Sequence, residues 1–221
     1  MKAMILAAGR GERMGAFTRA TPKPLLEVHG KALIEYQIER LVVAGYHDIV
    51  INVAYLGEMI KARLGDGAAY GVNITYSVEA VGALGTGGGV RQALPHLGHD
   101  AIAIVNADVW TDYPYERLTG LPKSGVHLVL VPNPEHVPEG DFALNGNEVS
   151  RHGPARHTFS GIAAYRPDLF AGRPGEAFSL VRVIDEAIER GNVTGELYKG
   201  TWVDVGTPER YRALLSAHRA V

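Results

Sequence analysis

Cationic and glycine residues cluster behind the first apolar stretch of the chain. Residues 3–6 are apolar, and Ala7 and Ala8 lead from them into Gly9-Arg10-Gly11. A buried parallel strand that runs into a glycine-spaced turn has this pattern. Glycine lets backbone N–H groups approach an anion and allows a positive φ without the penalty of a Cβ atom. We therefore expect a phosphate-binding loop here.

Arg13 and Lys23 would add positive charge to this loop. Prolines on both sides of Lys23 restrict the backbone, so that its ammonium group is held at a defined place. The spacing excludes two common phosphate loops. The G-x-G-x-x-G pattern needs glycine where Met14 stands, and the Gly30-Lys31 pair is not followed by Ser or Thr. An ordinary connection with charges for solubility is the alternative.

Two aspartates stand beside predicted elements. Asp108 follows the apolar residues 101–105, which predict a strand, and would lie where open α/β sheets bind their ligands. Its hard oxygen atoms suit Mg²⁺, which usually takes one or two carboxylates together with substrate phosphates. Asp204 is expected in the loop before a last helix, with Thr207 as N-cap and Pro208 as first residue. By position alone Asp204 is a turn acid.

A second glycine-rich stretch, residues 79–89, follows a predicted strand and opens into a predicted helix at 90–94. This places it at the same edge of the sheet. The ionised carboxylate of Glu79 can only accept hydrogen bonds, so it suits a ligand with an N–H donor, of the kind that N3 of uracil or thymine carries and N3 of cytosine does not. A flexible connector carrying a solvated acid is the alternative.

The first half of the chain alternates strand and helix patterns: strand 3–6, helix 33–42 before Gly45, strand 47–53, helix 56–64, strand 72–77 and strand 101–105. The second half predicts strands at 125–131, 141–144, 148–151 and 158–165, a hairpin turn at Asn145-Gly146 and a helix at 178–188. We predict an α/β fold with a Rossmann-like, mostly parallel mixed sheet flanked by helices, and a small antiparallel subregion over its carboxyl edge. One domain would span residues 1–221, with halves 1–112 and 113–221.

Several motifs resemble those of the sugar-1-phosphate nucleotidyltransferases: Leu6-Ala7-Ala8-Gly9, Gly11, Arg13-Met14, Pro22-Lys23-Pro24-Leu25, Leu84-Gly85-Thr86, Asn106-Ala107-Asp108 and Trp202-Val203-Asp204-Val205-Gly206-Thr207. The resemblance implies Arg13, Lys23, Asp108 and Asp204 as catalytic residues and Asp108 and Asp204 as ligands of a Mg²⁺ cofactor. It implies nucleotide contacts by Ala7, Ala8, Gly9, Gly11, Arg13, Lys23, Glu79, Thr86 and Gly87. Many members carry Arg-Pro-Leu-Thr where this chain has Gly15-Ala16-Phe17-Thr18, so it lacks their arginine.

The first half would then bind nucleotide and the second half sugar phosphate, with sugar contacts by Asn106, Gly140, Asp141, Thr158 and Ser160. Within the family, the chain is most similar to short N-acetylmuramate α-1-phosphate uridylyltransferases of bacterial cell-wall recycling. UTP and a sugar 1-phosphate are the expected partners, and Arg151, Arg156 or Arg182 would bind the lactyl carboxylate. The alternatives are UTP or dTTP with glucose 1-phosphate, GTP with mannose or heptose 1-phosphate, or a non-catalytic nucleotide-binding regulator.

The composition is that of a globular chain with a full core: 221 residues, 46% hydrophobic and 21% charged. A formal net charge of −2 gives no basic footprint for a nucleic acid polymer. The chain has no cysteine, which excludes disulfides and thiolate metal sites and favours a cytoplasmic location. We expect no secretory signal, no membrane span, no fused acetyltransferase domain and no protein partner.

Overall fold

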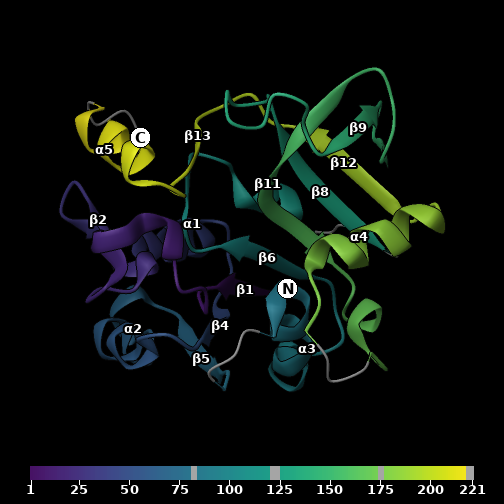
Figure 1. The fold of residues 1–221 in the computed structure, drawn as a ribbon. Coiled ribbons are helices and arrows are strands. Elements are labelled where there is room, and N and C mark those ends of the chain that lie inside the picture. The colour runs from purple at the N-terminus through teal and green to yellow at the C-terminus, as the bar shows by residue number, and fades with distance from the viewer. Residues whose placement is uncertain (81–83, 120–124, 174–176, 218–221) are drawn as a thin grey trace.

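The computed structural model describes residues 1–80, 84–119, 125–173 and 177–217, and a large mixed sheet runs through its centre (Figure 1). The α-helices of these residues are α1 Leu33–Val43, α2 Gly57–Leu64, α3 Gly85–Leu97, α4 Leu180–Glu189 and α5 Pro208–Ser216. Their strands are β1 Lys2–Leu6, β2 Glu27–Val28, β3 Lys31–Ala32, β4 Asp48–Val53, β5 Asn73–Val78, β6 Ile102–Asn106, β7 Val109–Thr111, β8 Val126–Val131, β9 Phe142–Asn145, β10 Glu148–Ser150, β11 Arg156–Tyr165, β12 Val193–Leu197 and β13 Trp202–Asp204.

The large sheet has the strand order β5-β4-β1-β6-β11-β8-β12-β10-β9. Its first four strands are parallel, as the alternating pattern of the first half predicts. β11 then pairs antiparallel with both β6 and β8, while β12 is parallel to β8. The strands of the second half therefore extend the same sheet sideways. We expected them to lie over its carboxyl edge instead. The mixed, helix-flanked sheet is confirmed.

Two apolar clusters cover the two faces of this sheet. One packs α1 and α2 against side chains such as Ile5, Ile51 and Val105, and the other packs α3 and α4 against side chains such as Met4 and Ile104. Strands buried on both faces need continuous apolar runs, which explains the composition of β1, β4 and β6. The sheet edge is thereby held rigid between two helical layers.

The last helix returns to the start of the chain, and Figure 1 shows α5 in yellow beside the purple N-terminal elements. The Tyr211 hydroxyl donates to the Glu27 carbonyl oxygen at 2.7 Å, and its ring meets Phe17 edge-on at 5.3 Å between centroids. Thr207 caps α5 by accepting from the Arg210 N–H, and Pro208 is the first helical residue, both as predicted. This docking brings the residues just before α5 to the carboxyl edge of the sheet.

The structure differs from expectation in the glycine-rich stretch. Helix α3 begins at Gly85, so Gly85 to Gly89 are helical rather than loop, while residues 81–83 lie outside the described residues. A Cβ on Gly87 would lie 2.4 Å from the Phe178 ring, and one on Gly89 would lie 2.4 Å from Glu79 Oε1. The glycines serve close packing around a helix, a role that composition alone does not separate from loop flexibility.

Strand β12 has no counterpart among the sequence-based predictions. Its central Gly195 breaks the apolar pattern, yet a Cβ there would lie 2.7 Å from Val149 Cγ2, which explains the glycine. The predicted hairpin is present, with Asn145 paired to Glu148 and Gly146 at φ 61° in the turn. Among the described residues, none of the helices combines the length and hydropathy that a bilayer span requires.

Candidate active site

A cleft of about 570 Å³ lies at the carboxyl ends of β1, β4, β5 and β6. Gly85, Thr86 and Gly206 line part of it. The other lining residues come from the first loop, the Pro-Lys-Pro segment and these strand ends: Leu6, Ala7, Ala8, Gly9, Arg10, Gly11, Glu12, Arg13, Lys23, Pro24, Asn52, Glu79, Asn106, Ala107 and Asp108. A hollow of about 480 Å³ near Arg173 and Arg190 contains none of the predicted nucleotide or metal residues and, among the three candidate arginines, only Arg182. The cleft thus gathers most of the predicted nucleotide contacts in one place.

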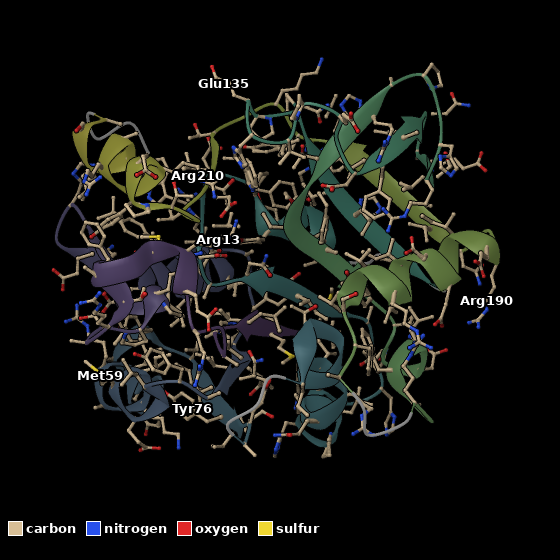
Figure 2. All side chains as sticks on the ribbon, viewed as in Figure 1. Arg13, Met59, Tyr76, Glu135, Arg190 and Arg210 are labelled. Carbon is tan, nitrogen blue, oxygen red and sulfur yellow. The ribbon has the colours of Figure 1, made fainter. Side chains whose placement is uncertain are left out.

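The first loop has the shape expected of an anion cradle. Gly11 has φ 65°, and a Cβ on it would lie 3.2 Å from the Lys23 Cβ, so glycine is required on both counts. A Cβ on Gly9 would meet nothing within 4 Å, which leaves its backbone open to the cleft. Arg13 is exposed on the cleft wall, and Figure 2 shows it well inside the outline of the molecule, unlike Met59 or Tyr76.

Lys23 is buried beside Asp108. Only 8% of Lys23 is exposed, and its Nζ donates to the Asp108 carboxylate. Pro22, in extended conformation at φ −66°, precedes a short 3-10 turn at Lys23–Leu25, in which the Leu25 N–H donates to the Pro22 carbonyl at 2.8 Å. The proline-braced lysine therefore stands at the cleft with its charge neutralised by the acid on β6's carboxyl side.

A two-stranded ribbon brings Asp204 to Asp108. Asp204 pairs with Val109 in the β7–β13 ribbon, and the Val205 N–H donates to the Asp108 carbonyl oxygen at 3.0 Å. Asp204 is thus the last residue of a strand, where we expected a loop. A Cβ on Gly206, which lines the cleft, would lie 3.0 Å from Asp204 Oδ1. The ribbon therefore places Asp204 close to the backbone of Asp108: Asp108 lines the cleft, and Asp204 lies next to Gly206, which also lines it.

Asp204 also has two basic residues as neighbours. Arg210 Nη2 lies 3.2 Å and His136 Nε2 3.8 Å from its Oδ2 atom. The Nε and Nη2 atoms of Arg210 are buried without a hydrogen-bond partner. Figure 2 shows Arg210 in the interior of the view, whereas Glu135 lies at the rim.

The donor set fits Mg²⁺ chemically, because both candidate ligands offer carboxylate oxygen. In the part of the chain that the structure describes, no three acidic or histidine side chains are grouped to hold an ion. An ion at Asp108 and Asp204 would therefore complete its coordination with phosphate and water oxygen atoms, which is the usual mode for Mg²⁺.

Glu79 lines the cleft from the end of β5 and is only 5% exposed. Its Oε1 accepts a hydrogen bond from Asn52 Nδ2 at 2.6 Å. Burial raises the pKa of the Glu79 carboxyl, and the hydrogen bonds from Asn52 and the Leu84 backbone only partly offset that rise. Glu79 is thus buried and hydrogen-bonded, and the alternative of a solvated loop acid is wrong.

Thr86 and Gly87 direct their polar groups to the second half of the chain. The Thr86 hydroxyl accepts from the Leu180 N–H at 2.8 Å, and the Gly87 N–H donates to the Phe178 carbonyl at 2.9 Å. These contacts fasten α3 to the start of α4. Their proposed nucleotide contacts remain predictions.

The predicted sugar residues lie mostly outside the cleft lining, except Asn106. Asp141 Oδ2 accepts from the Phe159 N–H at 2.8 Å, and the Thr158 hydroxyl donates to Asn133 Oδ1 at 3.0 Å. The Ser160 hydroxyl donates to the Val129 carbonyl at 2.7 Å inside a register shift of β11.

Gly140, at φ 64°, packs so closely that a Cβ would lie 2.8 Å from the His157 backbone nitrogen. The structure thus gathers Gly140, Asp141 and Thr158 around the start of β11, with their polar side-chain atoms already bonded within the protein.

Comparison with known proteins decides the family. The model of the nucleotidyl transferase family matches residues 2–129, more than half of the chain. The chain belongs to this family. Its members are enzymes, and the resemblance to sugar-1-phosphate nucleotidyltransferases is confirmed.

Two curated relatives match this nucleotidyltransferase over nearly its full length. The N-acetylmuramate alpha-1-phosphate uridylyltransferase of Neisseria meningitidis is 48% identical over 216 residues, which cover 94% of each chain. The enzyme of the same name from Caulobacter vibrioides is 33% identical, covering 94% of this chain and 92% of its own. A Bacillus anthracis crystal structure, assigned as a glucose-1-phosphate thymidylyltransferase and holding a sucrose, has a TM-score of 0.85 at 21% identity and covers 100% of this chain and 98% of its own. The last match shows the shared fold.

Sequence reasoning does not identify Asn52, Arg210 or His136 as part of the nucleotidyltransferase site. Asn52 has a signal in the sequence, because it is a lone amide inside the apolar run of β4. Arg210 follows the cap of α5 and His136 lies between prolines, and neither position indicates an approach to Asp204. Their places follow from tertiary docking.

Proposed function

We propose that this nucleotidyltransferase transfers UMP from UTP to N-acetylmuramate α-1-phosphate, giving UDP-N-acetylmuramate and pyrophosphate. The supporting observation is the 48% identity to the Neisseria uridylyltransferase across 94% of both chains. The cleft adds an acceptor acid, Glu79, beside a phosphate-type loop, which suits a triphosphate of uracil.

In the proposed reaction a phosphate oxygen of the sugar phosphate attacks the α-phosphorus of UTP, and pyrophosphate leaves with the electrons of the broken bond. Repulsion between the anions is the obstacle to this step. Lys23, Arg13 and the open amides around Gly9 would neutralise and orient the triphosphate. Lys23 would exchange its partner Asp108 for phosphate oxygen as the nucleotide enters.

We infer that Asp108 and Asp204 hold Mg²⁺ in the working enzyme. When bound, the ion would supply charge neutralisation and alignment of the phosphates. The two carboxylates would give up Lys23 and Arg210 as partners in exchange for the ion.

Of the three arginines considered for the lactyl carboxylate, Arg156 is the one we propose. Arg151 is committed to Asp185 through two hydrogen bonds and stacks on Phe142 at 4.5 Å. Arg182 lies by the hollow at α4. Arg156 stands beside Asp141 and has a buried Nε atom without a hydrogen-bond partner. Its replacement should raise KM for N-acetylmuramate 1-phosphate more than for a sugar phosphate without the lactyl group.

We further propose that the enzyme works in the cytoplasm as part of peptidoglycan recycling. A cysteine-free chain suits a reducing compartment, and UTP would be its donor there. The predicted division at residue 112, between a nucleotide half and a sugar half of a single domain, is part of the same proposal.

A pyrophosphate-release assay tests the proposal. UTP, dTTP, CTP and GTP are each combined with N-acetylmuramate, glucose and mannose 1-phosphates, with and without Mg²⁺. The expected result is the highest kcat/KM for UTP with N-acetylmuramate α-1-phosphate, lost when the metal is chelated. A higher kcat/KM for GTP with mannose 1-phosphate would reject the proposal, and so would the absence of turnover with every combination of nucleotide and sugar phosphate.

A further inference from the structure

Asn52 is a buried amide in the middle of the sheet. It lies on β4, between Ile51 and Val53, and is 3% exposed. A buried amide without partners is costly, so its contacts need an explanation. Asn52 is not among the residues that the proposed mechanism uses.

The hydrogen bonds of Asn52 define its orientation. The Ala7 N–H can only donate, so the Asn52 Oδ1 atom, at 2.9 Å from it, must be the acceptor. The amide nitrogen then faces Glu79 and donates to its Oε1 atom at 2.6 Å. The side chain cannot be flipped without losing both bonds.

Asn52 thereby connects the two loops of the cleft. β4 lies between β1 and β5 in the sheet, and Asn52 is opposite Leu6 on one side and Ser77 on the other. Ala7 opens the first loop and Glu79 follows the end of β5. One side chain therefore sets the distance between the phosphate loop and the acid beside it.

Helix α3 closes the space on the other side of this pair. A Cβ on Gly89 would lie 2.4 Å from Glu79 Oε1 and 2.8 Å from Asn52 Nδ2. The helix backbone thus packs directly against the hydrogen bond and leaves the carboxylate little room to rotate.

We propose that Asn52 is a positioning residue that keeps Glu79 as a hydrogen-bond acceptor facing the nucleobase, and so selects bases with a ring N–H donor over cytosine. This inference rests on the proposed transfer from UTP. An amide N–H donates to the carboxylate and cannot accept from it, so the bond favours the ionised acid that a uracil N3–H requires.

Asn52→Asp is the decisive variant, because it keeps the shape and replaces the donor by a second carboxylate. The new aspartate and Glu79 would share one proton. While that proton is present, the aspartate can donate a hydrogen bond to Glu79 as the amide does, and once it is lost there is no donor. The groups packed on Glu79 are the Asn52 amide from β4, the Gly89 backbone from α3 and the Leu84 N–H. The charged residues that share the cleft with it are Arg10, Glu12, Arg13, Lys23 and Asp108.

The expected result is a pH-dependent KM. From about pH 6 to about pH 9, the KM of Asn52→Asp for UTP should rise roughly tenfold relative to that of the unaltered protein, as the shared proton is lost. The preference for UTP over CTP should fall in parallel, while KM for the sugar phosphate changes little. A merely structural role would not produce a pH-dependent base preference.

Asn73→Asp is the matched control. Asn73 Nδ2 also donates to a carboxylate, Asp48 Oδ1 at 3.2 Å, but both residues are exposed at the far end of β4 and β5. This variant should keep the KM for UTP and its pH profile.

Asn52→Val covers the case in which Asn52→Asp does not fold, since valine suits a strand and has no polar atom that could donate to Glu79. It should lower the UTP preference, and adding Glu79→Gln should lower it no further, because Asn52 acts through Glu79. A pH-independent KM and unchanged preference in folded Asn52 variants would overturn the proposal. No turnover by the unaltered protein with any nucleotide would instead reject the proposed function.

Discussion

The proposed nucleotide half and the proposed sugar half differ in where their predicted site residues lie. In the first half, Arg13, Gly9 and Lys23 line the cleft, and the partner of Lys23, Asp108, lines it too. In the second half, Asp141, Thr158 and Ser160 are already hydrogen-bonded to their own surroundings. A motif built on glycines and braced charges thus predicts residues that line the cleft, whereas polar residues inferred from position coincide with side chains that bond to neighbouring strands and loops.

Loss of Asp108 or of the metal should have the largest effect on kcat, and this loss tests the site in the first half. Asp108→Asn, or chelation with EDTA, should lower kcat by about 10³-fold, because the charge at the reacting phosphates is no longer neutralised. Pyrophosphate release measures this. Asp168→Asn, an exposed acid away from the cleft, is the control and should keep full activity. Undiminished turnover under chelation would remove the metal assignment.

Gly87→Ala separates packing from nucleotide contact at the start of α3. The new Cβ would lie 2.4 Å from the Phe178 ring and 3.1 Å from the Ser179 backbone, so the free energy of unfolding should fall by about 1–3 kcal/mol. Urea denaturation gives this value. Gly9→Ala, whose Cβ meets nothing within 4 Å, should change stability by less than about 0.5 kcal/mol. Equal stability of the two variants would contradict the packing role.

Asp141→Asn and Ser160→Ala sharpen the comparison within the sugar half. Ser160→Ala leaves the Val129 carbonyl without its donor and should lower the free energy of unfolding by about 1 kcal/mol with little change in KM. Asp141→Asn can keep the bond from Phe159 N–H through its amide oxygen, so it should preferentially raise KM for the sugar phosphate. Steady-state kinetics and thermal unfolding distinguish them. A raised KM in Ser160→Ala would show that this buried hydroxyl also reaches the sugar.

The smallest expected effect concerns Glu35 in the first half, whose carboxyl should make the stability of the protein depend on pH. Burial raises the pKa of this carboxyl, but hydrogen bonds from Arg63, Tyr70 and the Ala32 N–H outweigh it, so that its pKa lies below the ordinary value for a glutamate. The folded protein therefore gains stability from ionised Glu35 above that value and loses it as pH falls through the lowered pKa. Tm measured from neutral to acid pH should fall more steeply for the unaltered protein than for Glu35→Gln. Parallel curves would contradict it.

Local signals in the sequence predict the first half well. The apolar runs of β1, β4 and β6 and the brace around Lys23 depend on neighbouring residues, and all are present. In the second half the cap at Thr207 is a local signal of the same kind. Asn52 and Arg210 gain their roles only through strand order and helix docking, which single-sequence patterns do not carry. The same holds for β12, whose Gly195 fits a tertiary contact rather than a strand pattern.

The β7–β13 ribbon joins acids that are 96 positions apart in the chain, as the residue numbers 108 and 204 show. During biosynthesis residue 204 leaves the ribosome after the strands β1 to β12 have been synthesised, since the chain is made from its N-terminus. A nascent chain would then contain Lys23 and Asp108 before it contains Asp204, the second acid of the proposed metal site. The capacity to activate nucleotides would arise as one of the last events of maturation, so an unfinished polypeptide could not consume triphosphate.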